Sequence, residues 1–420
     1  MAAAQQPAAP PGDHAQAPSA AVQAAATPQL HSINVSLDIL AAFGSSTASN
    51  ADIRTLQGGG HDPSQRGFTL QEAELGLSGA IDQSFAGEAM VGATLLPDGT
   101  TEVELEEAFL VTTALPHDLQ VKAGHYLTEF GRINPMHPHG WVWIDQPIVI
   151  SRIFGGDGTR APGARLAWEL PGDTPGQIII GVQNAGGEAL QSFLANDEVY
   201  AERPVGGRFF VEREIRSWND FLYSARIEKD LKLGDATGIS LGASLAYGPN
   251  ATGPGADTIV YGADFVLRWK GSDDHSFTLQ GEVVARDFEA ADQIDQNDPT
   301  VTGDEVAVPG ATLHDWGFYL QGHWRCGGGW GFGLRGEWAS GSGASYDQTT
   351  DTFARSGDPF RADRLRITPL ITYETSAMSR LRLQYDYDDT DQLDDPEHSV
   401  WLGFVVMIGQ HPKHVYRPQH

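Results

Sequence analysis

The sequence predicts an all-β protein, a transmembrane antiparallel β-barrel of about 16 strands, and three observations predict it. Apolar and polar residues alternate with a period of two along most of the chain after residue 32. The connections between the alternating segments tend to be short and long in turn. Aromatic residues bracket the apolar faces. Short turns at one end, long loops at the other and aromatic girdles are typical of outer-membrane barrels.

The alternation is regular enough to mark individual strands. In residues 258–270, Ile259, Tyr261 and Phe265 share one face, while Asp264 and Arg268 lie on the other. Each such segment is about as long as a tilted membrane-spanning strand. The sixteen predicted segments are 33–44, 68–81, 84–96, 101–114, 119–130, 162–170, 177–185, 220–230, 237–248, 257–270, 275–288, 313–325, 329–340, 362–374, 378–389 and 398–409.

The lengths of the connections set the orientation of the predicted barrel. Links from even to odd segments are tight, as at 271–274 and 326–328. Links from odd to even segments are often long: 45–67, 131–161, 186–219, 289–312 and 341–361. Short turns are periplasmic and long loops extracellular in such barrels, and an even strand number places both termini on the periplasmic side.

A soluble β-sandwich or propeller would also alternate, so the chemistry of the two faces has to decide. The polar faces carry Arg, Asp, Glu, Gly and Ser, and no blade-length repeat is visible. Aromatic residues lie where membrane girdles are expected, and they favour the membrane barrel. These residues are Trp269, Trp316, Trp324, Trp330, Trp338, Tyr373 and Tyr387.

The predicted barrel, residues 33–409, is flanked by two short segments. Residues 1–32 are rich in Ala, Pro and Gln and cannot build a core, so we expect a disordered segment there. They also lack the basic and apolar regions of a signal peptide. Residues 410–420 are expected to form a periplasmic tail.

Composition excludes several classes of protein. The chain has 27 Lys and Arg against 55 Asp and Glu, a formal net charge of -28, which is a poor basis for binding nucleic acid. The single cysteine, Cys326, excludes a disulfide framework. The motifs G-x-S-x-G, H-E-x-x-H and the P-loop are absent, so we predict no enzyme; a lipid hydrolase using a lone Ser and His is the alternative.

Three stretches carry a family resemblance. They are GFTLQEAELGLSGAID, EVELEEAFL and LQVKAGHYLTEFGRINPMHPHGWVWIDQPIVISRIFGGDGTRAPGARLAWELP. A strand, an aromatic loop and a Gly-rich re-entry in this order resemble the phosphate-selective porin O/P superfamily. The resemblance implies a trimeric outer-membrane channel of 16 strands with one extracellular loop folded into the lumen. The loop after the fifth strand carries Arg132, Arg152 and Arg160 rather than a dense basic ladder, so phosphate specificity is not predicted.

Strand parity predicts which charges line the lumen. The predicted acidic set is Glu72, Glu74, Glu88, Glu102, Glu104 and Glu106, and the basic set is Arg335, Arg364, Arg366, Arg380 and Arg382. Opposed acidic and basic walls would create a transverse field that orients dipolar solutes. The alternative is that these charges pair across strands and solvate the interior. Glu107 falls on the lipid parity, so a bulge or a position near the rim is expected there.

The long loop over residues 127–161 is the predicted constriction, because loops of this length are usually functional or disordered. Its tryptophans and prolines predict that it packs. Its polar residues Arg132, Asp145, Arg152 and Asp157 are candidates to face the pore. The alternative is a loop that only plugs and stiffens the barrel.

Two kinds of cation site are considered. His137 and His139 in the loop, and His411 and His414 after the last strand, have a spacing that can bind zinc or copper; otherwise they are loop histidines bonded to the backbone. The acidic loops 289–312 and 389–397 could bind a divalent cation, although no EF-hand pattern is present. No other cofactor is predicted.

These features together predict a porin in the outer membrane of a diderm, Gram-negative-type bacterium. It would pass small hydrophilic solutes or ions by passive diffusion, with weak preference for cations, as a homotrimer surrounded by outer-membrane lipid. The alternative is a plugged barrel that serves as a structural envelope protein or as a scaffold for a metal or redox partner.

Overall fold

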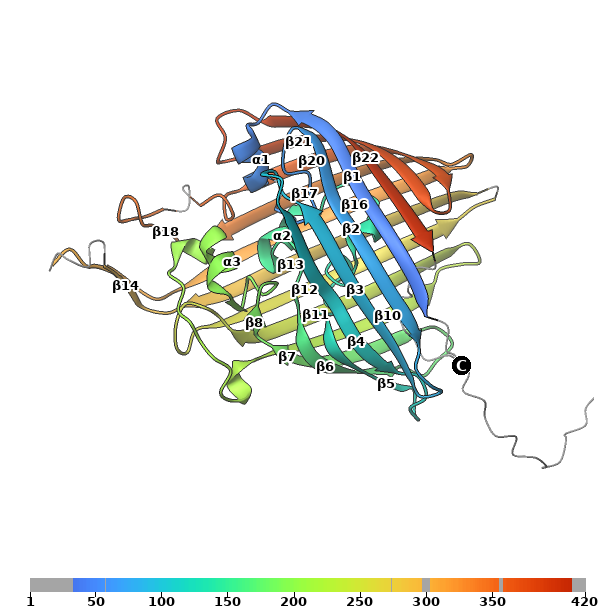
Figure 1. Cartoon of the computed structure of the whole chain (residues 1–420), viewed down its shortest axis with the longest axis horizontal. Helices are drawn as coiled ribbons and strands as arrows, with labels where there is room; N and C mark the ends of the chain where they lie inside the picture. The colour runs from blue at the N-terminus through green and yellow to red at the C-terminus, as the bar shows by residue number, and fades with distance from the viewer. Residues whose placement is uncertain (1–32, 57, 273, 297–302, 355–357, 410–420) are drawn as a thin grey trace, which may run out of the picture.

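Sixteen strands close into one antiparallel barrel in the computed structural model, which describes residues 33–56, 58–272, 274–296, 303–354 and 358–409 (Figure 1). The ring closes where the first and last strands pair, from Ser36 opposite Gly409 to Ser46 opposite Ser399. The predicted terminal segments 1–32 and 410–420 lie outside the described residues.

All sixteen predicted segments are barrel strands, with bounds within a few residues of those expected. The strands are β1 (Asn34–Ser46), β2 (Gly67–Ala80), β3 (Phe85–Leu95), β4 (Thr101–Thr112), β5 (Leu119–Leu127), β6 (Arg160–Glu169), β7 (Gly176–Asn184), β10 (Phe221–Lys232), β11 (Thr237–Pro249), β12 (Asp257–Lys270), β13 (His275–Ala290), β16 (Ala311–Cys326), β17 (Trp330–Ser342), β20 (Arg364–Ser376), β21 (Ser379–Thr390) and β22 (Glu397–Gly409).

Short elements occupy the long connections. The helices are α1 (Asn50–Leu56), η1 (Pro138–Gly140), α2 (Ile148–Phe154), α3 (Asp197–Glu202), η2 (Val205–Gly207) and η3 (Trp218–Asp220). Small two-stranded sheets are formed by β8 (Gly186–Gly187) with β9 (Leu194–Ala195), β14 (Gln293–Asp295) with β15 (Val306–Val308), and β18 (Tyr346–Asp347) with β19 (Thr352–Phe353). None of the helices in the described ranges has the length and apolar character needed to cross a membrane.

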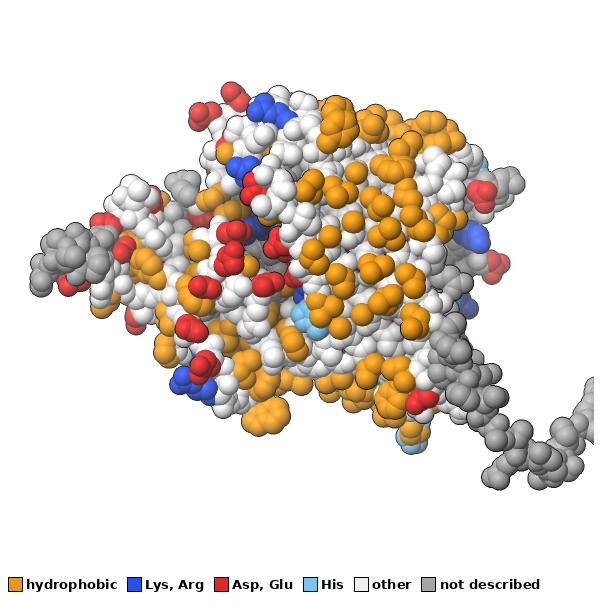
Figure 2. Space-filling model, viewed as in Figure 1, with side chains coloured by type: hydrophobic (Ala, Val, Ile, Leu, Met, Phe, Trp, Pro, Cys, Tyr) orange, Lys and Arg blue, Asp and Glu red, His pale blue; other side chains and the backbone are white. Residues whose placement is uncertain are grey.

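The outer face of the barrel is apolar. Along β16, exposed Phe318 and Leu320 alternate with buried neighbours such as Tyr319. Apolar side chains cover the face that β1 to β4 present in Figure 2, and acidic side chains gather toward the long-loop end. Aromatic pairs mark the short-turn end, with ring centroids 5.8 Å apart in Trp269–Trp324 and 4.7 Å apart in Trp330–Tyr373. This pattern suits a wall in contact with lipid.

One bulge changes the parity of β4. Met90 pairs with Glu107 and Val91 pairs with Leu105, so Glu106 is the extra residue. As a result Glu106 and Glu107 are both buried although they are consecutive. Phe109 then faces inward and Leu110 outward. The bulge expected from the position of Glu107 in the sequence is therefore present.

The barrel interior holds two of the long connections. Residues 128–159, between β5 and β6, include α2, whose seven residues are all buried and which packs on β13, β16 and β17. The loop and residues 185–195 share an apolar core with wall residues such as Val260 and Tyr319. Phe130, Ile150, Ile153, Leu190 and Phe193 in this core are almost completely shielded from solvent. The interior at this level is therefore packed by side chains.

Candidate functional site

The loop 128–159 is anchored to the barrel wall on two sides, through different chemistry. One anchor is Asp145, which contacts arginines of β17 and β20. The other is His137, which contacts glutamates of β2 and β4. We name these two groups the arginine anchor and the acidic cluster, and define their members below.

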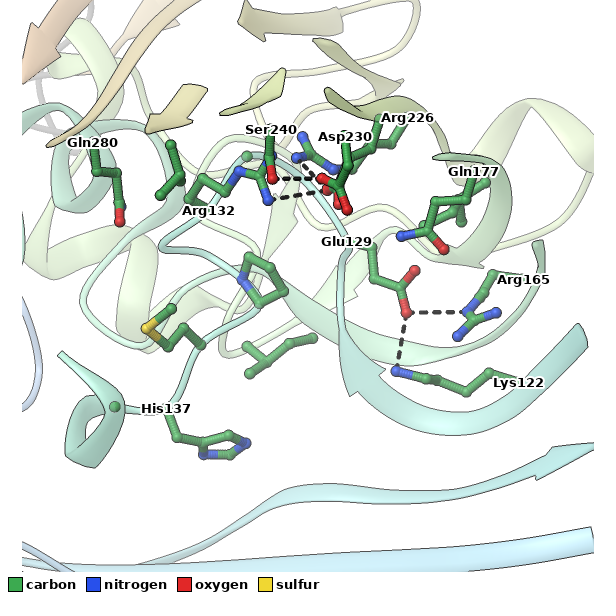
Figure 3. Close-up of a pocket in the computed structure, with 18 of the residues that line it drawn as sticks. Lys122, Glu129, Arg132, His137, Arg165, Gln177, Arg226, Asp230, Ser240 and Gln280 are labelled. Atoms are coloured by element: carbon green, nitrogen blue, oxygen red, sulfur yellow. Dashed lines mark hydrogen bonds and ion pairs between the residues drawn. The ribbon is translucent and has the colours of Figure 1, made fainter. Parts of the chain in front are cut away.

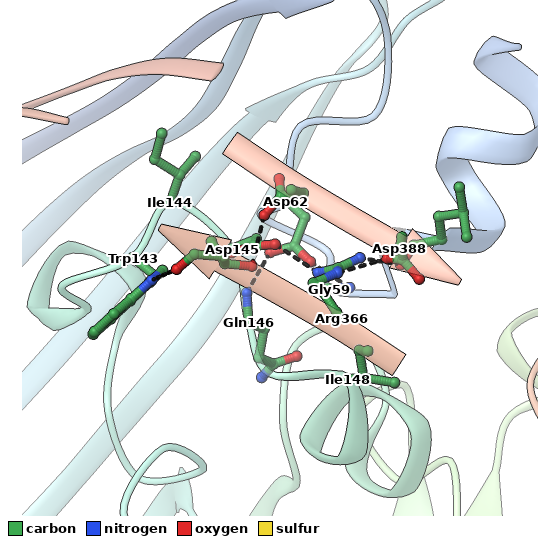
Figure 4. Close-up of polar contacts among 12 residues, drawn as sticks. Gly59, Asp62, Trp143, Ile144, Asp145, Gln146, Ile148, Arg366 and Asp388 are labelled. Carbon is green, nitrogen blue, oxygen red and sulfur yellow. Dashed lines mark hydrogen bonds and ion pairs between the residues drawn. The ribbon is translucent and has the colours of Figure 1, made fainter. Parts of the chain in front are cut away.

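The arginine anchor consists of Arg335, Arg364, Arg366 and Arg382 with Asp145 and Asp388. Asp145 Oδ1 lies 2.5 Å from Arg335 Nη2. Asp145 Oδ2 lies 2.6 Å from Arg366 Nη1 (Figure 4). Gln384 Nε2 donates to Asp145 Oδ1 at 2.8 Å. The two arginines hold the pKa of Asp145 below its ordinary value, against the opposing effect of burial. The carboxylate is therefore ionised and fully paired.

The remaining arginines of this region secure neighbouring backbone. Asp388 bridges Arg364 and Arg366, at 2.6 Å from each. Arg366 also donates to the carbonyl of Leu56 at 2.9 Å, and Arg382 donates to that of Trp143 at 2.7 Å. The arginine side chains are thus buried between the wall and the loop rather than facing a water-filled passage.

The acidic cluster consists of Asp38, Glu72, Glu74, Glu106 and Glu107 with His61, His137 and His139, all of them buried. Strand pairing places Asp38 of β1 directly opposite Glu74 of β2. Glu106 and Glu107 come from the bulge of β4. His61 lies in the connection between α1 and β2, and the other two histidines lie in the loop 128–159.

His137 is the centre of this cluster. Its Nδ1 lies 2.8 Å from Glu74 Oε2 and 2.9 Å from Glu106 Oε2, and its Nε2 lies 3.0 Å from Glu107 Oε2. Burial alone would lower the pKa of His137, but the three glutamates outweigh it and hold the pKa well above its ordinary value. His139 Nδ1 lies 3.5 Å from Glu74 Oε1. These loop histidines therefore meet carboxylates, whereas the sequence had left open contacts to backbone.

The other predicted site residues are dispersed. Glu88 is buried on β3, and Glu102 and Glu104 lie at the less buried end of β4, where Glu104 pairs with Arg160. Arg380 donates to the carbonyl of Trp141 at 3.1 Å. The predicted acidic and basic sets do occupy separate sectors of the wall, but only β22 and β1 stand between β21 and β2. The two sectors are neighbours, so the expectation of walls facing each other across the lumen is corrected.

The predicted constriction residues also take different positions. Arg132 pairs with Asp264 at 2.6 Å and with Glu228 at 3.1 Å. Arg152 is buried and donates to the carbonyl of Ala362 at 2.8 Å. Asp157 keeps 40% of its side chain exposed and lies 3.5 Å from His61. Of the four, Arg132 lines the interior cavity described next.

A cavity of about 510 Å³ opens between the loop 128–159 and the wall toward the short-turn end (Figure 3). We call it the vestibule. Its charged lining comprises Lys122, Arg132, Arg165, Arg226 and Arg268 with Glu107, Glu129, Glu228 and Asp230. Glu129 pairs with Lys122 and Arg165, at 3.0 Å from each, and Arg226 pairs with Asp264 at 2.6 Å. The vestibule is thus strongly charged and nearly balanced.

Most of the vestibule charges are absent from the lumen charges predicted from the sequence, although the alternation had placed Arg268 on the polar face of its strand. Lys122, Arg165, Arg226 and Arg268 lie on β5, β6, β10 and β12, which the alternation had correctly marked as strands. Parity applied to those strands, and not only to the densest acidic and basic segments, would have placed them on the lumen face.

Comparison with known proteins adds information on the fold. No family model matches the chain. An uncharacterised protein from Aquifex aeolicus (strain VF5) is 36% identical over 139 residues, which are 32% of this chain and 28% of that protein. The match thus spans less than a third of the relative's length.

Two solved structures cover nearly the whole chain. An anion-selective porin from Comamonas acidovorans aligns over 90% of this chain and 100% of its own, with a TM-score of 0.53 and 10% identity. The outer membrane channel DcaP of Acinetobacter baumannii aligns over 90% and 97%, with a TM-score of 0.53 and 12% identity. At these identities the likeness establishes that the fold is that of the porin barrels.

Proposed function

We propose that the protein is an outer-membrane porin that passes small hydrophilic solutes or ions by passive diffusion. The observation that carries the proposal is the charged vestibule of about 510 Å³ inside a closed barrel with an apolar outer face. An apolar exterior requires lipid, and a charged interior cavity requires water. The proposal places the barrel in the outer membrane of a diderm bacterium, and it involves no catalytic step.

The proposed selectivity is a weak preference for cations. Five cationic and four acidic side chains line the vestibule, so its own field is close to balanced. The chain as a whole has a net charge of -28, and acidic mouths concentrate cations in the adjacent solution. Charges at the mouth are screened over ~8 Å at physiological ionic strength, so the preference falls as salt rises.

Recordings in planar lipid bilayers test both statements. We expect discrete conductance steps from the purified full chain and a cation-selective reversal potential under a KCl gradient at low salt. An anion-selective potential at low salt would contradict the proposed selectivity and support a phosphate-type porin. Absence of conductance would contradict the porin itself.

A plugged barrel is the second candidate, because one observation favours it. Ile150 and Ile153 of α2 pack with Leu190 and wall residues into an apolar core inside the barrel. Such a core blocks water wherever it spans the lumen. The barrel would then be a structural envelope protein or a scaffold. A silent wild-type chain that conducts after residues 148–154 are replaced by a Gly-Ser segment would support this candidate, whereas steps from the wild type would exclude it.

We also propose that the protein assembles as a homotrimer in the lipid bilayer. The barrel wall is short where β4 meets β5, because the two strands pair only over Ala108–Val111 of β4, opposite residues 122–125 of β5. Beyond it, Glu102 is exposed on the rim and Glu104 half-exposed. A neighbouring subunit packed against the apolar face of β1 to β4 would shield this gap. Native mass measurement in mild detergent should give three chains, and a monomer would contradict the assembly.

A further inference from the structure

In the described residues, the groups of side chains that could together hold a metal ion all lie in the acidic cluster. Three overlapping triads bring their ligand atoms within 4.8 Å of one another: Asp38 with Glu74 and His139, Glu74 with Glu106 and His137, and Glu106 with Glu72 and His61. Every member of these triads is buried. Glu74 and Glu106 each belong to two triads, so the middle triad links the whole cluster.

The charges of the cluster are unequal. Five carboxylates face three imidazoles, and an imidazole carries a positive charge only when protonated. Lys122 lies near the outer member Glu107, and Arg160 near Glu106. Glu72 lies deeper: its side chain is fully buried, its carboxyl group is in hydrogen-bonding contact with that of Glu106, and no amide, hydroxyl or guanidinium donor in the described part of the chain bonds either oxygen. Its carboxylate faces Glu106 and the ring of His61, 3.8 Å away. A buried carboxylate of this kind calls for a cation.

The geometry around His137 matches a metal ligand and its supporting residue. Nδ1 faces Glu74 and Glu106 at 2.8 and 2.9 Å. Ligand atoms on a tetrahedral zinc ion are roughly 3.3 Å apart, so shifts of a few tenths of an ångström would admit the ion. Nε2 lies 3.0 Å from Glu107. A metal-bound histidine typically donates its other N–H to a carboxylate, which fixes the ring and raises its basicity.

The local backbone provides both space and access. Gly92 of β3 pairs with Glu74, and a Cβ at this position would overlap the Glu106 carboxylate. A cavity of about 20 Å³ lies beside His61, Glu106 and His137, which is room for one water-sized species. His137 and His139 also line the vestibule, so the cluster borders that cavity.

We propose that Glu74, Glu106 and His137 bind one divalent transition-metal ion, with zinc the representative probe. Glu107 is the residue that orients His137, and Glu72, which shares a triad with Glu106, is a further carboxylate beside the site. Mixed imidazole and carboxylate ligands suit zinc and its neighbours better than magnesium, which prefers oxygen ligands and retains its water. The proposal does not depend on whether the barrel conducts. The competing possibility is a cluster held by protons alone, with His137 doubly protonated.

The test uses the full chain without a polyhistidine tag, folded in detergent and treated with a chelator. Zinc is then titrated against a chromophoric competitor, and bound metal is measured after gel filtration. We expect one zinc ion per chain and no comparable binding of magnesium. Failure of the wild type to retain stoichiometric zinc would overturn the proposal and leave the proton-only cluster.

Variants separate this site from the acidic loops and the other histidines. The double variant E74Q/E106Q should lose at least 100-fold in zinc affinity, and E107Q should lose 10- to 100-fold, as is usual when the carboxylate behind a histidine ligand is removed. Glu88→Gln is the matched control, because Glu88 is buried on β3 but belongs to none of the triads. Wild-type affinity in the double variant would overturn the proposed site.

Cobalt(II) gives a direct spectroscopic readout on the wild-type chain, so this test does not depend on whether the variants fold. Bound in place of zinc, it should produce visible absorption bands of a low-coordinate ion with nitrogen ligation, and zinc should displace them. His137→Gln should shift these bands where the variant still migrates as a folded barrel. A wild-type spectrum identical to that of the hydrated ion would contradict the assignment.

Discussion

The arginine anchor and the acidic cluster hold the same loop, a few residues apart, but their charges are balanced in different ways. At Asp145 each carboxylate oxygen meets a guanidinium group, and guanidinium groups stay charged at every accessible pH. At His137 the carboxylates outnumber the groups that can neutralise them, and the neutralising groups are imidazoles. The ion pairs of Asp145 itself therefore need no proton and no metal ion, whereas the contacts of His137 depend on protons or a metal ion.

The difference lies in the residue types that each wall offers to the loop. Arginine presents a planar fork that satisfies two acceptors at once, so Arg366 can hold Asp145 and Asp388 together. Around His137, β2 and β4 offer the loop only hydrogen-bond acceptors, because Glu74, Glu106 and Glu107 are all carboxylates. Four substitutions test this comparison.

Removing Arg366 should have the largest effect. Arg366→Met removes a positive charge that pairs with both Asp145 and Asp388 in a buried site. This loss should lower the free energy of unfolding by about 3–5 kcal/mol. We expect a marked fall in the temperature at which the folded barrel converts to the unfolded band on a gel. Arg325→Gln is the control, because its pair with Glu374 is exposed and contributes ~0.5 kcal/mol. Equal shifts for both variants would refute the importance of the arginine anchor.

Neutralising the loop side of the same anchor should have an intermediate effect. Asp145→Asn keeps the shape but removes the charge that Arg335 and Arg366 share, at a cost of about 2–3 kcal/mol. With the loop held less firmly, bilayer recordings should show more frequent transitions between conductance levels. Asp157→Asn, in the same loop but partly exposed, should leave the recordings unchanged. If Asp145→Asn shows no increase in transitions between conductance levels, the acidic cluster is the group that holds the loop.

Asp62 should give the arginine side a pH dependence of its own. Burial, reinforced by the charge of Asp145, raises the pKa of Asp62 to about 7 from 3.8. Between pH 4 and 7 the folded chain retains a proton that the unfolded chain has released, so stability falls as pH rises through this window. At about 1.4 kcal/mol per pH unit, the part of this loss that falls above pH 5 should be roughly 2–3 kcal/mol.

The measurement is the unfolding temperature at pH 5 and pH 8. Asp62→Asn should abolish the part of the difference that Asp62 causes, whereas Asp173→Asn in an exposed turn should retain it. An unchanged difference in Asp62→Asn would show that the acidic cluster, and not this aspartate, governs the pH response.

The smallest effect concerns ion selectivity. Arg268 lines the vestibule and is exposed within it, whereas Arg364 is buried against Asp388. Arg268→Gln should move the reversal potential by a few millivolts toward cations at low salt, because charges in contact with the permeating ion weigh most. Arg364→Gln should leave the potential unchanged if the chain folds. The reverse order would mean that the permeation path follows the arginine anchor.

The architecture could be predicted from the sequence because a lipid-facing wall imposes strict alternation. Glu107 shows how far this reaches: a carboxylate on the lipid parity indicated either a bulge or a position near the rim, and the structure contains the bulge. The positions of the lumen charges could not be predicted in the same way. Parity assigns Arg364 to the inner face but cannot show that Asp388 and the carbonyl of Leu56 cover it. Those contacts depend on how the interior loops pack, which is a long-range property.

His137 illustrates the same limit within the candidate site. The sequence singled out His137 and His139 by their spacing, and separately marked Glu74 and Glu106 as inward-facing. Joining them requires the height of each residue in the wall and the path of the loop 128–159. Neither follows from local periodicity, because strand stagger and loop path are set by the closed barrel as a whole.

The seam between β1 and β22 has a consequence for how the chain reaches its native state. Residues 36–46 hydrogen-bond to residues 399–409, so the pairing that completes the ring joins segments separated by almost the entire barrel sequence. Contacts between such distant segments pay a large loop-closure entropy and form slowly. Until β22 arrives, β1 presents an unpaired edge that can pair with other chains. We therefore expect the final strand to limit the rate of assembly, and a chain that ends before residue 397 to aggregate.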